Sequence, residues 1–459
     1  MIEVNDNILN NVTNIHFVGI GGAGMCPLAE ILFSKNYIIT GSDINETDTL
    51  KRIRDMGIKV HMGHNPENIN NAHLVVYTSA VNMSNPELIA AVNNNIPVIE
   101  RSVLLGMVSR KFENSIAIAG THGKTTTTSM ISQILIGAKK DPTIVIGGKL
   151  PLTGTNGRAG NSNLFVCEAC EYVDTFLQLT PSVSVILNID ADHLDYFGTI
   201  SKIIESFRNF AKKTSDTLII NGDDLNTTHA VEDLDHNIIT FGLNSYNDFY
   251  AENISEFDGA YNEFDVIHND ETVAHIQLGV PGRHNIMNAL AAVAAAHYMG
   301  ISFADIETHI KLFRGAGRRF EIYGKYGGIT IADDYAHHPT EINATLNAAK
   351  KLPHKKLWAI FQPFTFSRTV TWKNEFAQSL SNADHVILSP IMGSREDNIT
   401  GIKSEDIASL IPGAVCFDKF EDIADYIINN ADEDDYVITM GGGDIYKVAK
   451  ILQSKLISA

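Results

Sequence analysis

The first third of the chain alternates short apolar runs with segments that have the spacing of amphipathic helices. Residues 15–19, 37–40, 74–77 and 97–99 are predicted to be strands, and residues 25–34 a helix. Alternation of this kind favours a parallel sheet with helices on its faces.

A second block of the same kind begins at Ser115, where SIAIAG predicts a buried strand. Residues 164–169 (LFVCEA) and 182–189 (SVSVILNI) are apolar almost throughout, as strands buried on both faces of a parallel sheet are. An alanine-rich helix is predicted over residues 285–299.

A third block begins near Glu321 and contains four strand-like runs, GITIADDY, KLWAIFQP, HVILSP and DYVITMGGG, separated by helix-length segments. The boundaries are expected near residues 112 and 320. The pattern therefore predicts an α/β fold of three domains, 1–112, 113–320 and 321–459.

Composition agrees with a multidomain globular protein. The chain has 459 residues, 44% hydrophobic and 19% charged, which is too long for one hydrophobic core. Its net charge of -19 argues against a nucleic-acid surface. We expect no signal peptide, since the N-terminal residues do not show a basic segment followed by an apolar one. We also expect no membrane-embedded segment, since no uncharged apolar run is long enough to span a bilayer. Four cysteines fit a reducing compartment, and a cytoplasmic location is expected.

Cys167 and Cys170 form a C-x-x-C pair without a second pair or histidines to complete a zinc site. A redox pair is one interpretation. The favoured interpretation is that the two cysteines are small, partly buried residues beside a site.

The segment AIAGTHGKTTTTS resembles a phosphate-binding loop, although Gly120 makes it two residues shorter than G-x-x-x-x-G-K-[ST]. A strand, a glycine turn and a helix start would present several N–H groups to one anion. Lys124 would reach the β- and γ-phosphates, and the Thr125 hydroxyl would ligate Mg²⁺.

A second glycine loop, GIGGAG, spans residues 19–24 directly after a predicted strand, and Asp43 follows near the position of a ribose-binding acid. The motif alone favours NAD, but any nucleotide diphosphate fits its physics, UDP-sugars included. Two such loops in consecutive domains favour an enzyme that hydrolyses one nucleotide as its energy source and binds a second nucleotide as part of a substrate.

Acids and a histidine follow the central strands: Glu168 and Glu171 after one, and Asp190, Asp192 and His193 after the next. Ligands of open α/β sheets bind at the carboxyl ends of the strands. Carboxylates and imidazole there suit a metal ion bound to phosphates.

These motifs identify the chain as a member of the Mur ligase family of peptidoglycan synthesis. GTHGKTTT, CEACEYVDTFL, NIDADHLDYF, GRHNIMNALAA, GAGRRFE and DDYAHHPTE occur in the family's order over essentially the whole chain. IHFVGIGGAGM makes the chain most similar to the branch that adds L-alanine to UDP-N-acetylmuramate.

The resemblance implies an N-terminal Rossmann-like domain for the UDP-substrate, a central ATP-binding domain with a parallel or mixed sheet, and a C-terminal Rossmann-like domain that closes over the site. It implies ATP, with Mg²⁺ or Mn²⁺, and activation of the carboxylate of UDP-N-acetylmuramate as an acyl phosphate, which the amine of L-alanine attacks. A monomer or a homodimer fits this family.

Residue roles carry over from the family's motifs. Lys124, His193, His337 and Arg368 would be catalytic. The metal would lie on Thr125, Glu171 and His193, and Glu168 is the weaker candidate of the two glutamates. The amino acid would meet Tyr335, His337 and Arg368. The UDP-substrate would contact Gly19, Gly21, Gly22, Gly24, Asp43 and Ser79, and ATP would contact Gly120, Thr121, His122, Gly123, Lys124, Thr125, Thr126, His284, Asn285, Asn288, Arg319 and Asp334.

Some positions depart from the family. Phe364 and Thr365 follow FQP where His-Arg or His-Thr is common, and IMGSRE, residues 391–396, replaces a Y-A-A-[GR]-E segment. Amino-acid selectivity is therefore the least defined feature. Lys212 and Lys213 are interpreted as a solvated helix face. His297 and His385, without evident partners, are interpreted as structural.

Three alternatives stay open at this point. A ligase that recycles murein tripeptide would share both nucleotide loops. An NAD-dependent oxidoreductase would leave the ATP loop unexplained. A nucleotide-sensing regulator would bind ATP without releasing phosphate, although Lys124, Glu171 and His193 argue against it.

Overall fold

The computed structural model describes residues 7–394 and 396–458. The chain folds into two compact units. The first runs to Tyr250 and includes Ile267–Ala274 and Asn288–His309; the second includes Ala251–Val266, His275–Met287 and the chain from Ile310. Within the described ranges, no helix has both the length and the apolar character needed to cross a bilayer.

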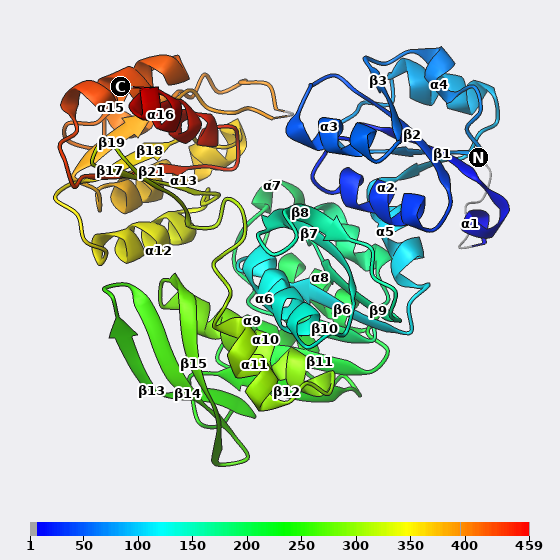
Figure 1. The fold of residues 1–459 in the computed structure, drawn as a ribbon, viewed down its shortest axis with the longest axis horizontal. Helices are drawn as coiled ribbons and strands as arrows, with labels where there is room; N and C mark the ends of the chain where they lie inside the picture. Colours follow the sequence, from blue (N-terminus) through cyan, green and yellow to red (C-terminus); the bar gives the residue numbers. More distant parts are fainter. Residues whose placement is uncertain (1–6, 395, 459) are drawn as a thin grey trace. The chain divides into compact units, whose positions relative to one another are not determined.

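The first sheet has five parallel strands in the order β3-β2-β1-β4-β5. Figure 1 shows β1, β2 and β3 of this sheet in blue. Its core consists of buried apolar side chains such as Ile15, Phe17, Leu28 and Leu74. The elements are α1 (Ile8–Asn11), β1 (Asn14–Val18), α2 (Met25–Ser34), β2 (Ile38–Asp43), α3 (Asp48–Asp55), β3 (Lys59–Met62), the 3-10 helix η1 (Pro66–Ile69), β4 (Leu74–Tyr77), α4 (Pro86–Asn93), β5 (Val98–Glu100) and α5 (Arg101–Ser109).

The second sheet has ten strands in the order β15-β14-β13-β12-β11-β10-β6-β9-β7-β8. Its strands are β6 (Asn114–Ala119), β7 (Thr143–Leu150), β8 (Thr155–Arg158), β9 (Leu164–Glu168), β10 (Val183–Ile186), β11 (Thr217–Asn221), β12 (Asn237–Gly242), β13 (Phe249–Phe257), β14 (Tyr261–His268) and β15 (Glu271–Pro281). Its helices are α6 (Lys124–Gly137), η2 (Tyr172–Gln178), α7 (Leu194–Phe197), α8 (Ile200–Ala211), α9 (Leu225–Val231), α10 (His284–Tyr298) and α11 (Phe303–Ile310). Strand β6 pairs in parallel with both β10 and β9, so their carboxyl ends share one edge.

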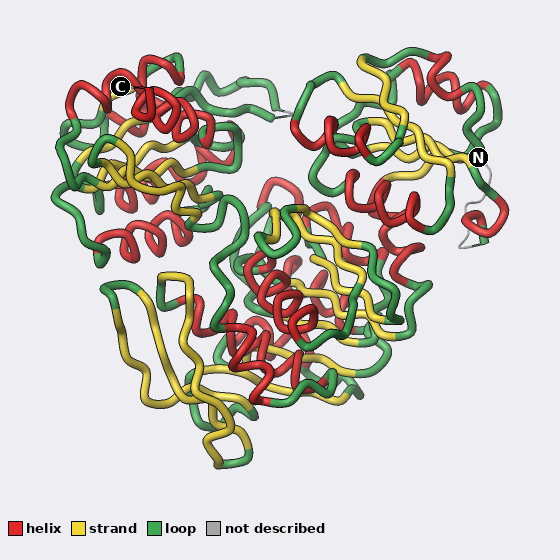
Figure 2. The backbone as a smooth tube through the Cα atoms, in the orientation of Figure 1, coloured by secondary structure: helices red, strands yellow, loops and turns green. Residues whose placement is uncertain are grey.

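The third sheet has six strands in the order β16-β17-β21-β18-β19-β20, all parallel except the β16–β17 pair. Figure 2 shows the strands of this sheet in yellow with red helices on both sides of them. The elements are β16 (Glu321–Tyr326), β17 (Ile329–Asp334), α12 (Pro339–Lys350), β18 (Leu357–Phe361), α13 (Phe366–Leu380), β19 (His385–Leu388), α14 (Ser404–Ala408), β20 (Val415–Cys416), α15 (Phe420–Asn430), β21 (Tyr436–Met440) and α16 (Tyr446–Ser458).

The predicted three-part α/β architecture is confirmed, and α2 and β4 have the predicted bounds. The strand predicted to continue to residue 189 is too long, because β10 ends at Ile186. The chain beyond it contacts the phosphate loop, where Thr121 N–H donates to Asn188 O at 3.1 Å. Strand β3 and the antiparallel strand β16 were not predicted, since their apolar and polar positions are mixed and both are partly exposed.

His297 and His385 have structural surroundings, but the expectation that they lack partners is wrong. The His297 ring stacks on Phe303 with 4.2 Å between ring centroids, and His385 stacks on Trp358 at 4.0 Å. Lys212 and Lys213 are exposed, as expected, although they follow the last residue of α8 instead of lying along its face.

A buried polar network lies beneath the carboxyl edge of the first sheet. The Glu87 side chain is fully buried; its carboxylate accepts hydrogen bonds from Ser42 Oγ at 2.6 Å and Asn68 Nδ2 at 2.6 Å. His64 Nδ1 lies 2.9 Å and His16 Nε2 3.7 Å from its oxygens. Burial alone would raise the pKa of Glu87, but the hydrogen bonds outweigh it and lower the pKa to about 2.

We expect Glu87→Gln to lower the free energy of unfolding at pH 7 by about 3 kcal/mol, the equivalent of this pKa shift. A depressed pKa stabilises the fold above the unfolded value of 4.5, and this stabilisation is lost as the pH falls towards 2. Urea titrations of both proteins between pH 7 and pH 2 check this. A stability difference that did not shrink at low pH would contradict it.

Candidate active site

The phosphate loop connects β6 to α6 and is shaped by two glycines with positive φ. Gly120 has φ 145°, and a Cβ there would lie 2.9 Å from Leu187 Cβ. Gly123, with φ 86°, is the residue that precedes α6, and a Cβ there would lie 2.4 Å from Asn288 Oδ1. Side chains are excluded at both positions, so the loop can bring its backbone N–H groups close to an anion.

The Lys124 ammonium lies between the loop carbonyls and a buried glutamate. Its Nζ contacts the two Glu171 oxygens at 2.9 and 3.1 Å and donates to the carbonyls of Gly120 and Thr121. Burial alone would lower the pKa of Lys124, but the Glu171 carboxylate outweighs burial and the pKa is raised. The lysine therefore stays charged in a largely buried position, as phosphate binding requires.

His193 comes close to the same glutamate from the loop after β10. Its Nε2 lies 3.9 Å from Glu171 Oε1 and 3.7 Å from Asp192 Oδ2, and its ring packs on Tyr172 with 4.6 Å between centroids. His193 has φ 52°, and the nearby Val173 has φ 53°. A β-branched residue in the left-handed region is strained by about 1–3 kcal/mol, and such strain gathers at functional sites.

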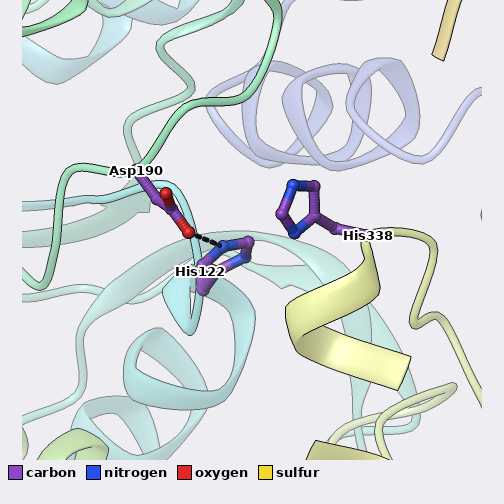
Figure 3. Close-up of side chains that lie close together, drawn as sticks. All are labelled: His122, Asp190 and His338. Carbon is purple, nitrogen blue, oxygen red and sulfur yellow. Dashed lines mark hydrogen bonds and ion pairs between the residues drawn. The ribbon is translucent and has the colours of Figure 1, made fainter. Parts of the chain in front are cut away.

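Two further contacts hold the loop in place. The His122 ring and the Asp190 carboxylate point toward each other, with 3.4 Å between Nε2 and Oδ2 (Figure 3). Asn188, which the sequence pattern did not single out, accepts from His122 N–H at 2.8 Å and donates to His122 O at 3.1 Å. Only the place of Asn188 directly after a strand could have indicated it.

The residues expected at the UDP-substrate lie along one edge of the first sheet. The glycines at 19–24 follow β1, Asp43 ends β2 and exposed Ser79 follows β4, and these three strands are neighbours. Asp43 Oδ2 accepts from Gly21 N–H at 2.9 Å, so the expected ribose-binding acid also shapes the loop.

Asn288, expected near adenine, contacts the phosphate loop's helix in this structure: its Oδ1 accepts from Thr127 Oγ1 at 3.3 Å. Asn285 donates to Pro281 O at 2.7 Å, and His284 begins α10. The predicted adenine contacts of these residues stay predictions.

In the second unit, Asp334 is buried at the end of β17. Its oxygens accept from Phe320 N–H and Ala336 N–H, both at 2.7 Å, and burial raises its pKa to about 6. Arg319, predicted to bind phosphate, lies over the Tyr335 ring at 5.0 Å. Arg318, which was not predicted, binds Asp333 and the carbonyls of Gly441 and Gly443, and so has a structural role.

The residues expected at the amino acid follow β17 and β18. His337 Nδ1 lies 3.0 Å from Tyr335 O and 3.3 Å from Glu341 Oε2, and the His337 ring packs against Phe364 with 6.2 Å between centroids. Arg368 lies in the first turn of α13, where its N–H donates to Thr365 Oγ1 at 3.4 Å.

The unusual segment at 391–396 packs on the same helix. Glu396 accepts from Ser367 N–H at 2.7 Å and Ser367 Oγ at 2.6 Å, while Arg395 lies outside the described residues. Cys167 and Cys170 are free thiols. Cys167 is buried, which raises its pKa and disfavours a reactive thiolate, whereas Cys170 is exposed.

The first unit also offers donors that fit a divalent cation. The Glu171 carboxylate is almost fully buried and pairs with the Lys124 ammonium, so if the ammonium turned to a phosphate the carboxylate would need another cation beside it. The hydroxyl of Thr125, the carboxylate of Glu171 and the imidazole of His193 are donor types that fit Mg²⁺ or Mn²⁺ bound to phosphates.

Three family models match successive parts of the chain. They are described as Mur ligase family, catalytic domain (residues 14–113), Mur ligase middle domain (residues 118–296) and Mur ligase, glutamate ligase domain (residues 318–443).

Individual relatives match over nearly the full length. A UDP-N-acetylmuramate–L-alanine ligase from Clostridium botulinum strain Langeland is 44% identical, over 97% of this chain and 98% of the relative. The crystal structure of UDP-N-acetylmuramate–alanine ligase from Thermotoga maritima is 30% identical with a TM-score of 0.83, covering 97% of this chain and 99% of that one. A murein peptide ligase from Psychrobacter arcticus is 27% identical with a TM-score of 0.76, covering 97% and 98%.

Proposed function

The chain belongs to the Mur ligase family, and we propose that it joins L-alanine to the carboxylate of UDP-N-acetylmuramate in peptidoglycan precursor synthesis, with ATP converted to ADP and phosphate. The observation that carries the proposal is the cluster of Lys124, Glu171 and His193 at the carboxyl edge of the central sheet. The whole-length relatives of that name support the choice of substrates.

The chemistry follows from the charges in this cluster. A carboxylate is a poor acyl donor, so the γ-phosphoryl group of ATP is first transferred to it, and the amine of L-alanine then displaces phosphate from the acyl phosphate. Negative charge builds on oxygen atoms in both steps, and Lys124 with the loop N–H groups stabilises it. Thr125, Glu171 and His193 would hold Mg²⁺, which supplies further neutralisation of the phosphates when it is bound.

In this proposal, residues of the C-terminal part of the chain bind the amino-acid substrate. Arg368 pairs with the carboxylate of alanine through its planar donor fork, and Tyr335 and His337 frame the reacting amine. The Phe364 ring packs against His337, and a Cβ built on Gly442 would lie 3.3 Å from Phe364 Cγ.

The domain division at residues 112 and 320, with successive UDP-substrate, ATP and amino-acid roles, is part of this proposal. So are a cytoplasmic location, where both nucleotides are available, and a role in cell-wall growth and division. Matches at 14–113, 118–296 and 318–443 support the division.

The test is phosphate release by the purified protein with ATP, Mg²⁺ and UDP-N-acetylmuramate, with L-alanine, glycine, L-serine or murein tripeptide as acceptor. We expect release with L-alanine and a product heavier by one alanine residue. Omission of Mg²⁺ or addition of EDTA should abolish it. Release only with tripeptide would assign the protein to recycling, and ATP binding without release would contradict ligase activity.

A further inference from the structure

Arg101 lies against the glycine loop of the first sheet. It begins α5 directly after β5, at the sheet edge that also carries residues 19–24. A Cβ built on Gly24 would lie 3.0 Å from Arg101 Cδ and 3.3 Å from both Nε and Nη1. The last glycine of the loop is thus covered by the arginine side chain, and any larger residue there would displace it.

The other arginines of the first sheet's domain are engaged. Arg52 Nη1 lies 2.6 Å from Glu30 Oε1, Arg54 pairs with Glu46, and Arg110 Nη1 donates to Gln178 O at 2.7 Å. Arg101, in contrast, has neither a hydrogen bond nor an ion pair within residues 7–394 and 396–458. It is nevertheless half-buried.

A half-buried cation without a counter-charge is unfavourable unless an anion joins it. The guanidinium carries a fork of N–H donors that matches phosphate oxygens, and a G-x-G-x-x-G loop brings a diphosphate to its last glycine. We propose, on the basis of the function proposed above, that Arg101 binds the diphosphate of the nucleotide-sugar substrate and is a specificity-determining residue of this site.

The test is calorimetric binding of UDP and of UDP-N-acetylmuramate to the full-length protein and its variants. We expect Arg101→Ala to weaken both ligands about 10- to 100-fold, as loss of a charge-assisted pair does. Arg101→Lys should retain part of the affinity as a point charge. Gly24→Ala should weaken both ligands by displacing the arginine without changing its charge. Arg54→Ala, the same charge change at a surface pair, should bind as wild type does.

The outcomes separate this inference from the proposed function. If wild-type protein does not bind UDP-N-acetylmuramate, the proposed function fails. If wild type binds and Arg101→Ala binds UDP equally well, the inference is overturned, and this holds also if Arg101→Ala lowers kcat alone. Thermal melts of each variant identify any loss of folding, in which case Arg101→Lys decides the question.

Discussion

Replacement of Lys124 by alanine is expected to reduce turnover roughly 10³-fold or more, because we propose Lys124 as the cation that neutralises the β- and γ-phosphates. Its Nζ already lies within 3.1 Å of both Glu171 oxygens and near two loop carbonyls. ATP would draw the ammonium away from these acceptors. The measurement is steady-state phosphate release with all substrates, which gives kcat and the KM for ATP.

The Lys124 variant needs two controls. Lys140→Ala removes an exposed lysine beyond the end of α6 and should leave turnover unchanged. Lys124→Ala leaves Glu171 buried without its partner, which costs about 3–5 kcal/mol when a buried pair is broken. Lys124→Ala with Glu171→Gln removes that charge, so it should recover thermal stability but not turnover. Turnover near the wild-type level in Lys124→Ala would refute the role of the lysine.

Replacement of His193 should lower kcat about 10²-fold with a smaller change in the KM for ATP. The imidazole lies 3.9 Å from Glu171 and is the donor predicted to hold the metal at the reacting carboxylate. Loss of the imidazole should therefore slow the chemical step more than it weakens ATP binding. Raising the Mg²⁺ concentration should restore part of the activity.

The backbone at His193 decides which variant is informative. Because its φ is 52°, His193→Ala adds backbone strain to the loss of the imidazole. His193→Asn is the matched choice, since asparagine tolerates the left-handed region. His229→Asn, at an exposed position of α9, is the control and should retain full activity. A variant whose KM for ATP alone rises would show a binding residue with no part in the chemical step.

The local sequence pattern was sufficient to predict those elements and loops whose characteristic residues lie close together in the chain. The apolar run at 74–77 forms β4, and the segment predicted to be helical at 25–34 forms α2. Both could be predicted because a strand buried on both faces and a helix each produce a pattern of apolar residues that is visible in consecutive positions. The phosphate loop was predictable for the same reason, since glycine, lysine and threonine act there through the backbone next to them. Lys124, Glu171 and His193 could be grouped because parallel strands end at one edge.

Other parts of the site depend on residues far apart in the chain. Asn188 and Asn288 support the phosphate loop across gaps of 66 and 161 positions, and a single asparagine in a loop or helix carries no local mark of such a contact. The sequence also did not indicate the different contacts of two adjacent arginines. Arg318 donates hydrogen bonds to one carboxylate and two backbone carbonyls of its own unit, whereas the Arg319 guanidinium lies over the Tyr335 ring.

The sequence by itself determined the three-part α/β fold, the two glycine loops and the acidic strand ends, because each follows from the period of side chains or from residues adjacent in the chain. Only the tertiary structure decided that Glu87 is buried among His16, His64 and Ser42, and that Arg101 covers Gly24 without a partner among the described residues. The physical reason is that burial and pairing of a charge depend on which distant strands the sheet brings together.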